Sequence, residues 1–122
     1  MRGLQQYKTT ALETAPNETL LLLLMEKVDE RLDQAAEALE AADRRSARDH
    51  MAFARAAFSE MMVSLDHDVA PDISAQLSRL YLWCIRELAK AGSQGDMDKL
   101  MGVKRITSSL LETWTEAIEV GA

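Results

Sequence analysis

The sequence of residues 44–65 is RRSARDHMAFARAAFSEMMVSL, and its apolar residues follow a helical repeat. They recur at alternating spacings of four and three residues: Ala47, Met51, Ala54, Phe58, Met61 and Leu65. Such spacing places side chains on one face of an α-helix. We therefore predict a helix over about 44–66. Asp43 is expected to cap it, because an aspartate at this position can accept a hydrogen bond from a free backbone N–H.

Three further segments show the same kind of repeat on either side of this helix. We predict helices over about 16–42, 72–91 and 97–119, each separated from the next by a short break. Gly92 is expected to end the third helix, and Gly95-Asp96 to form the last turn and cap. The core stripe expected on the third helix is Ile73, Leu77, Leu80, Cys84 and Leu88.

Four amphipathic helices joined by short turns, with no strand signal, predict an all-α fold. The arrangement typical of such a pattern is an antiparallel up-and-down four-helix bundle. We expect residues 1–122 to form a single domain, with the bundle over 16–120. Residues 1–15 are mostly polar and weakly patterned, so they are interpreted as a flexible N-terminal arm, a short extra helix being the alternative.

The bulk composition argues against several classes of partner. The chain has 122 residues and a net charge of −6, whereas nucleic-acid binding requires a basic surface that neutralises phosphates. The one local basic run, Arg44, Arg45, Arg48 and Arg55, is interpreted as a solvated helix face. The longest apolar run, Leu20 to Met25, is too short for membrane insertion. With one cysteine and no apolar signal segment, the protein is expected to be cytoplasmic.

No residue pattern points to catalysis, a metal site or a cofactor. His50 and His67 do not belong to the Glu-x-x-His pairs that bind metals in helical bundles. Neither is followed by the Lys and Gly typical of phosphotransfer bundles. Cys84 lies on the expected core stripe without a neighbouring base, so a nucleophilic role is not indicated. We therefore expect a protein that is not an enzyme.

Apolar residues are more numerous than one buried stripe per helix requires. They surround the helices at Leu20 to Met25 and at Leu80 to Ile85, and they crowd the second helix at Met61 to Val63. Three explanations remain open from the pattern. The first and third helices could be more deeply buried, the arm could pack on them, or a groove could bind an amphipathic helix of a partner.

Several short motifs occur in an order that resembles a known family. Tyr7 lies in the arm, and Thr14-Ala15-Pro16-Asn17-Glu18 precedes the leucine-rich helix. Ser64-Leu65-Asp66, Leu80-Tyr81, Arg86-Glu87-Leu88, Gly95-Asp96 and Trp114 follow at suitable spacing. The ordered set, over about 7–119, resembles the flagellar secretion chaperone (FliS) family. Ala15, Glu87 and Ala91-Gly92 depart from the family's usual Ser, second Arg and Ala-Asn.

The resemblance implies a function without catalysis. A chaperone of this family binds the C-terminal helical segment of flagellin in the cytosol, prevents its premature polymerisation, and assists delivery to the flagellar type III export apparatus. The arm is thought to cover part of the groove when flagellin is absent, for which Tyr7 and Leu12 are the candidates.

The expected groove residues have two origins. Tyr81 matches the family pattern, whereas the helical repeat suggests the others: Met62, Leu82, Trp83 and Ile85. Two alternatives remain. One is a helical bundle that self-associates as a homodimer or larger oligomer, and the other is a degenerate phosphotransfer-type bundle.

Overall fold

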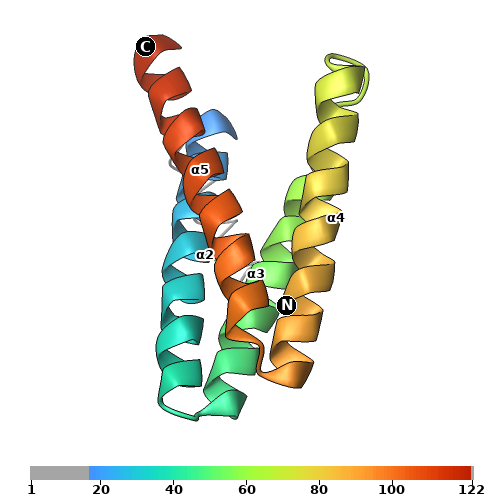
Figure 1. Cartoon of the computed structure of the whole chain (residues 1–122). Helices are drawn as coiled ribbons and strands as arrows, with labels where there is room; N and C mark the ends of the chain where they lie inside the picture. Colours follow the sequence, from blue (N-terminus) through green and yellow to red (C-terminus); the bar gives the residue numbers. More distant parts are fainter. Residues whose placement is uncertain (1–16, 122) are drawn as a thin grey trace.

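The computed structural model describes residues 17–121, which form four helices. They are α2 (Asn17–Glu40), α3 (Arg44–Val63), α4 (Pro71–Gln94) and α5 (Met97–Gly121) (Figure 1). The arm 1–15, including Tyr7 and Leu12, lies outside the described residues, and so does the start of the first predicted helix at Pro16.

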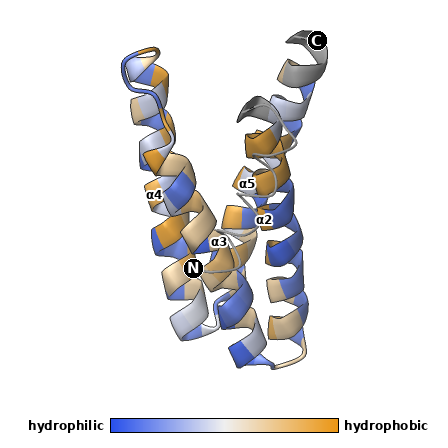
Figure 2. Cartoon of the chain, turned by 180° about the vertical axis from the view of Figure 1, so that it is seen from behind, coloured by the Kyte–Doolittle hydropathy of each residue, from blue (hydrophilic) through white to orange (hydrophobic). Residues whose placement is uncertain are grey.

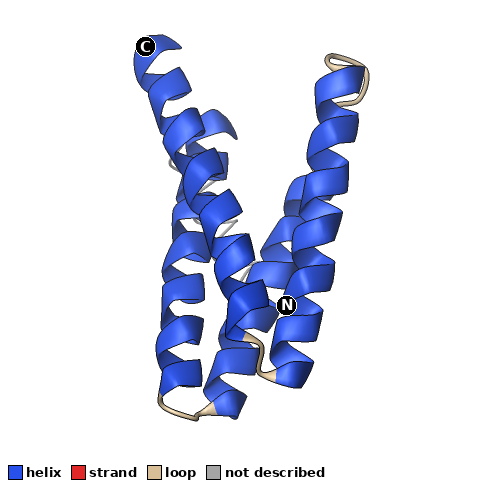
Figure 3. Ribbon diagram, viewed as in Figure 1, coloured by secondary structure: helices blue, strands red, loops and turns tan. Residues whose placement is uncertain are grey.

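The helices form an antiparallel ring of neighbours. α2 packs against α3 and α5, and α4 packs against the same two helices. The α2–α3 and α4–α5 turns lie at one end, with the α3–α4 loop at the other, and α4 and α5 diverge with distance from their shared turn (Figures 1 and 2). No strand occurs within residues 17–121 (Figure 3). The predicted all-α four-helix bundle is confirmed.

The helix boundaries follow from local capping chemistry. Asp43 accepts a hydrogen bond from the backbone N–H of Ser46 at 3.1 Å, as predicted for the start of α3. Asp96 likewise accepts one from the N–H of Lys99 at 3.1 Å. The prediction that Gly92 ends the third helix is wrong. α4 continues to Gln94, and Gly95 provides the left-handed residue, with φ of 65°.

The buried residues confirm the core stripe predicted for α3, whereas on α4 the buried stripe differs in part from the predicted one. On α3, Ala47, Met51, Ala54, Phe58 and Met61 are all buried, and Leu65 packs against them from the loop that follows. On α4 the buried side chains include Ser74, Tyr81, Cys84 and Leu88. Ile73 is instead 61% exposed, and Leu80 is only half-buried.

A polar side chain explains why the sequence suggested the wrong stripe near the start of α4. Ser74 is only 4% exposed, and its hydroxyl donates a hydrogen bond to the backbone carbonyl of Asp66 at 3.1 Å. A buried hydroxyl with a partner carries little of the free-energy penalty of an unpaired one. Hydropathy alone favours Ile73 for the core, whereas the loop carbonyl makes Ser74 suitable.

A polar network fixes α5 against α2. Lys104 Nζ lies 2.7 Å from Asp29 Oδ1 and 3.0 Å from Asp33 Oδ1. Ser108 donates a hydrogen bond to the same Asp29 oxygen at 2.9 Å. Burial alone would lower the pKa of Lys104, but hydrogen bonds and charge attraction from the two aspartates raise it above its ordinary value. The network holds α5 on α2 while leaving its other side turned toward α4.

Candidate functional site

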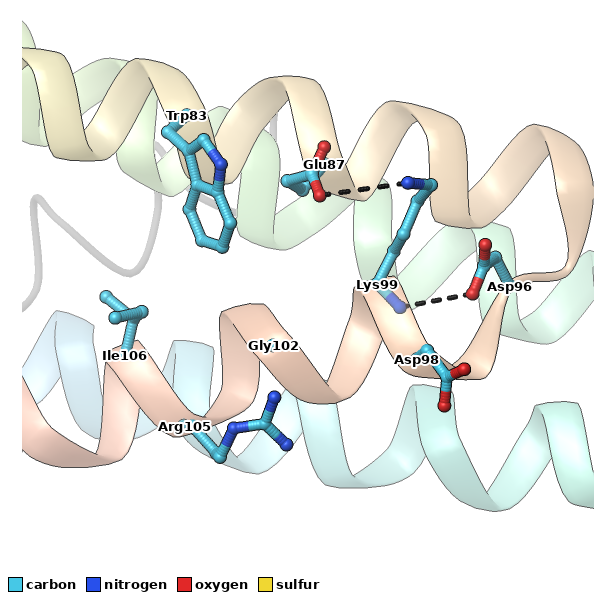
Figure 4. A pocket seen from close by; sticks show the side chains of 8 residues that line it. All are labelled: Trp83, Glu87, Asp96, Asp98, Lys99, Gly102, Arg105 and Ile106. Atoms are coloured by element: carbon cyan, nitrogen blue, oxygen red, sulfur yellow. Dashed lines mark hydrogen bonds and ion pairs between the residues drawn. The ribbon is translucent and has the colours of Figure 1, made fainter.

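A cleft of about 600 Å³ lies between α4 and α5, near the turn that joins them. Its apolar lining consists of Trp83 from α4 and of Gly102 and Ile106 from α5. Figure 4 shows Trp83 and Ile106 pointing toward each other from the two helices. The remaining lining residues are charged: Glu87, Asp96, Asp98, Lys99 and Arg105. The cleft therefore combines an apolar surface with a charged rim.

Part of the α5 wall of the cleft has no side chain, because residue 102 is glycine. If Gly102 carried a Cβ, that atom would lie 3.8 Å from Cη2 of Trp83. The indole thus lies beside this position of α5, while 41% of the residue remains exposed. Lys99 Nζ lies 3.9 Å from Glu87 Oε1, so an ion pair links the two helices on the rim. Farther from their shared turn, α4 and α5 move apart (Figure 1).

The predicted groove residues do not all lie on this cleft. Trp83 lines it, but Tyr81 is 1% exposed and its ring centroid lies 5.8 Å from that of Phe58 in the core. Burial raises the pKa of the Tyr81 phenol above its ordinary value. Met62 and Ile85 pack against the core, and Leu82 is half-buried. None of these three residues lines the cleft. Their binding roles stay predictions.

Of the eight residues that line the cleft, the sequence analysis named only Trp83 as a groove residue, and it missed the two other apolar ones, Gly102 and Ile106. Ile106 belongs to the apolar repeat of the helix predicted over 97–119, and it is only partly buried and lines the cleft. Gly102 had no assigned role. A glycine in a helix interior is unfavourable relative to alanine, and that cost was the one available signal in the sequence that position 102 has a role of its own.

Comparison with known protein families identifies the family of this chain. The sequence profile of the family described as flagellar protein FliS matches residues 1–121. The chain belongs to the FliS family of flagellar export chaperones. A search of curated protein sequences found no match.

In this FliS-family chain, the two histidines and the cysteine have ordinary structural surroundings. His50 Nδ1 accepts a hydrogen bond from Arg31 Nε at 2.8 Å, and Arg31 also stacks 4.4 Å from the centroid of the Phe53 ring. Burial and the Arg31 charge lower the pKa of His50. His67 is exposed in the α3–α4 loop. Cys84 is fully buried, and burial raises its pKa to about 12, which disfavours the reactive thiolate.

Within residues 17–121, no group of three or more His, Cys, Asp and Glu side chains is placed to hold a metal ion. None of the helices in the same range is long and apolar enough to cross a membrane.

Proposed function

We propose that this protein binds the C-terminal helical region of flagellin in the cytoplasm, prevents its premature polymerisation, and assists its delivery to the flagellar type III export apparatus. Membership of the FliS family supports a chaperone role in flagellar export. The observation that supports peptide binding is the Trp83 cleft, because an exposed tryptophan there lies beside an apolar wall and a charged rim.

The chemistry of the cleft suits an amphipathic helix. Such a helix places its apolar stripe in a groove and leaves its polar side at the edge. Trp83, Gly102 and Ile106 would contact the stripe, whereas Glu87, Lys99 and Arg105 would meet the polar side. A segment that is unfolded when free also incurs an ordering cost on binding, which the buried apolar area has to offset.

The structure allows an estimate for the contribution of Trp83. It is 41% exposed, and a tryptophan side chain has up to about 250 Å² of surface to bury, so about 100 Å² is available to a partner. At about 25 cal/mol per Å², covering this area contributes at most about 2.5 kcal/mol, or roughly fiftyfold in affinity.

Titration calorimetry with the C-terminal segment of flagellin from the same organism tests the proposal. We expect the parent protein to bind, to delay filament assembly of full-length flagellin, and Trp83→Ala to bind roughly ten- to fiftyfold more weakly. The matched control is Val69→Ala, because Val69 is 79% exposed in the α3–α4 loop and does not line the cleft. It should bind like the parent.

Stability has to be measured alongside binding. The indole also packs toward Gly102, so Trp83→Ala is expected to lower the thermal midpoint, and titrations belong well below it. Failure of the parent to bind or to delay assembly would refute the chaperone proposal. If the free protein instead forms a homodimer that Trp83→Ala dissociates, self-association is the better explanation of the cleft.

A further inference from the structure

A second, smaller cleft lies on the opposite side of α4, against α3. Its volume is about 230 Å³. Its lining comes from Arg48, Met51 and Arg55 on α3 and from Leu88, Ala89, Gly92 and Ser93 on α4. Pockets that bind small organic ligands usually measure about 300–1,000 Å³. This cleft is therefore of a size suited to one side chain or one small ion.

Its charge is opposite to that of the protein. The chain carries a net charge of −6, yet the charged residues of this lining are two arginines, without a carboxylate. Arg44 adds a third cation at the same end of the bundle, where its guanidinium donates a hydrogen bond to the Ser93 carbonyl at 2.8 Å. The cleft is thus a local positive site on an acidic molecule.

The two lining arginines have no acidic partner in the part of the chain that the structure describes. The ion pairs between residues 17 and 121 involve neither Arg48 nor Arg55. Within the same range, Nε of Arg55 is buried and lacks a hydrogen-bond acceptor. A buried donor without an acceptor is unfavourable, and more so when it is charged. An incoming anion would remove that penalty.

The walls of the cleft indicate which kind of anion fits. If Gly92 carried a Cβ, it would lie 3.6 Å from Cγ of Arg48 and 3.9 Å from Cε of Met51, so these side chains lie over the glycine. Leu88 and Ala89 add further apolar lining. A carboxylate on a short hydrocarbon stem matches both surfaces. Inorganic phosphate would place charged oxygens against the apolar wall.

We propose that this cleft, hereafter the arginine cleft, receives an Asp or Glu side chain of the flagellin segment. This inference rests on the proposed function and adds a polar anchor to it. Arginine offers several donors in a planar arrangement that matches a carboxylate, so a pair of arginines fixes the position of the acid as well as attracting it. The arginine cleft would set the register of the segment along the α3–α4 face.

Paired charge variants test the inference. Arg48→Gln and Arg55→Gln are titrated with the flagellin C-terminal segment, and with segments in which each Asp or Glu is replaced in turn by Asn or Gln. We expect each arginine variant to weaken binding about tenfold, as for loss of a charged hydrogen bond. The segment variant that lacks the bound acid should lose about the same affinity for the parent protein. It should lose little more for Arg55→Gln, because the two changes remove the same interaction. Arg45→Gln, an exposed residue of α3 outside the cleft, is the matched control.

The outcomes separate this inference from the proposed function. If the parent protein does not bind the segment, both the proposed function and the arginine cleft are refuted. If the parent binds and the arginine variants bind equally well, only the arginine cleft is refuted. If all three variants lose affinity equally, the arginine cleft is also refuted, and diffuse charge attraction explains the loss. If inorganic phosphate binds the parent but not Arg48→Gln, while the segment is insensitive, the site serves a free anion and the inference is wrong. Thermal melts confirm folding, and Arg48→Gln suffices if Arg55→Gln does not fold.

Discussion

Gly102→Ala is expected to stabilise the protein while weakening flagellin binding. The residue lies inside α5, where alanine is favoured over glycine by about 1 kcal/mol. The new Cβ would lie 3.8 Å from Trp83 and 4.0 Å from Arg105, which are ordinary contacts. The free energy of unfolding should therefore rise by about 0.5–1 kcal/mol, and the thermal midpoint by roughly 2–6 °C.

The same methyl group reduces the space in the Trp83 cleft. A partner that packs closely against the α5 backbone at this position would have to move away, and one added methyl in a packed interface costs about 1–3 kcal/mol. The expected loss of affinity is therefore roughly five- to hundredfold. Few variants change stability and binding in opposite directions, so this one distinguishes an occupied cleft from general damage to the fold.

The assay combines thermal melts followed by circular dichroism with titration of the flagellin segment. Ser109→Ala is the matched control, because Ser109 is exposed on the same helix and outside the cleft. It should gain a few tenths of a kcal/mol in stability and bind normally. Unchanged binding by Gly102→Ala would show that the segment does not approach α5 there. A lowered midpoint would show that α4 and α5 lie closer than the structure has them.

Three further predictions concern the stability of the bundle. Lys104→Met should lower the free energy of unfolding, measured by chemical denaturation, by about 1–3 kcal/mol, because the ammonium lies 2.7 and 3.0 Å from two α2 carboxylates and its side chain is 16% exposed. The exposed ion pair of Lys27 with Glu30 should contribute less than about 0.5 kcal/mol. The lowered pKa of His50 means that the unfolded chain binds a proton more readily, so stability should fall as pH drops below about 6.5, and His50→Gln should reduce that dependence. Gly95→Ala should cost about 1 kcal/mol, measured by thermal melts, because φ there is 65°.

The fold was predictable where one physical effect dominated. The repeat on α3 alternates without interruption, and every apolar position from Ala47 to Met61 in that repeat is buried. The caps at Asp43 and Asp96 depend only on chemistry within a few residues. The end of α4 was harder to predict, because two glycines, Gly92 and Gly95, lie close to it. Gly92 lies inside the helix, where a side chain would meet α3 only at ordinary contact distance, whereas Gly95 adopts the left-handed conformation that ends the helix.

The candidate sites were predictable only in part, because they depend on how neighbouring helices pack. The helical repeat places Trp83 off the core stripe and Tyr81 at its border, and only the packing of α4 on its neighbours decides that the phenol enters the core while the indole lines a cleft. The arginines illustrate the same limit. A basic run on an isolated helix is interpreted as a solvated face, whereas α4 converts Arg48 and Arg55 into the rim of a cleft with an unpaired buried donor. Charge in a sequence is therefore informative about binding only once the opposite wall is known.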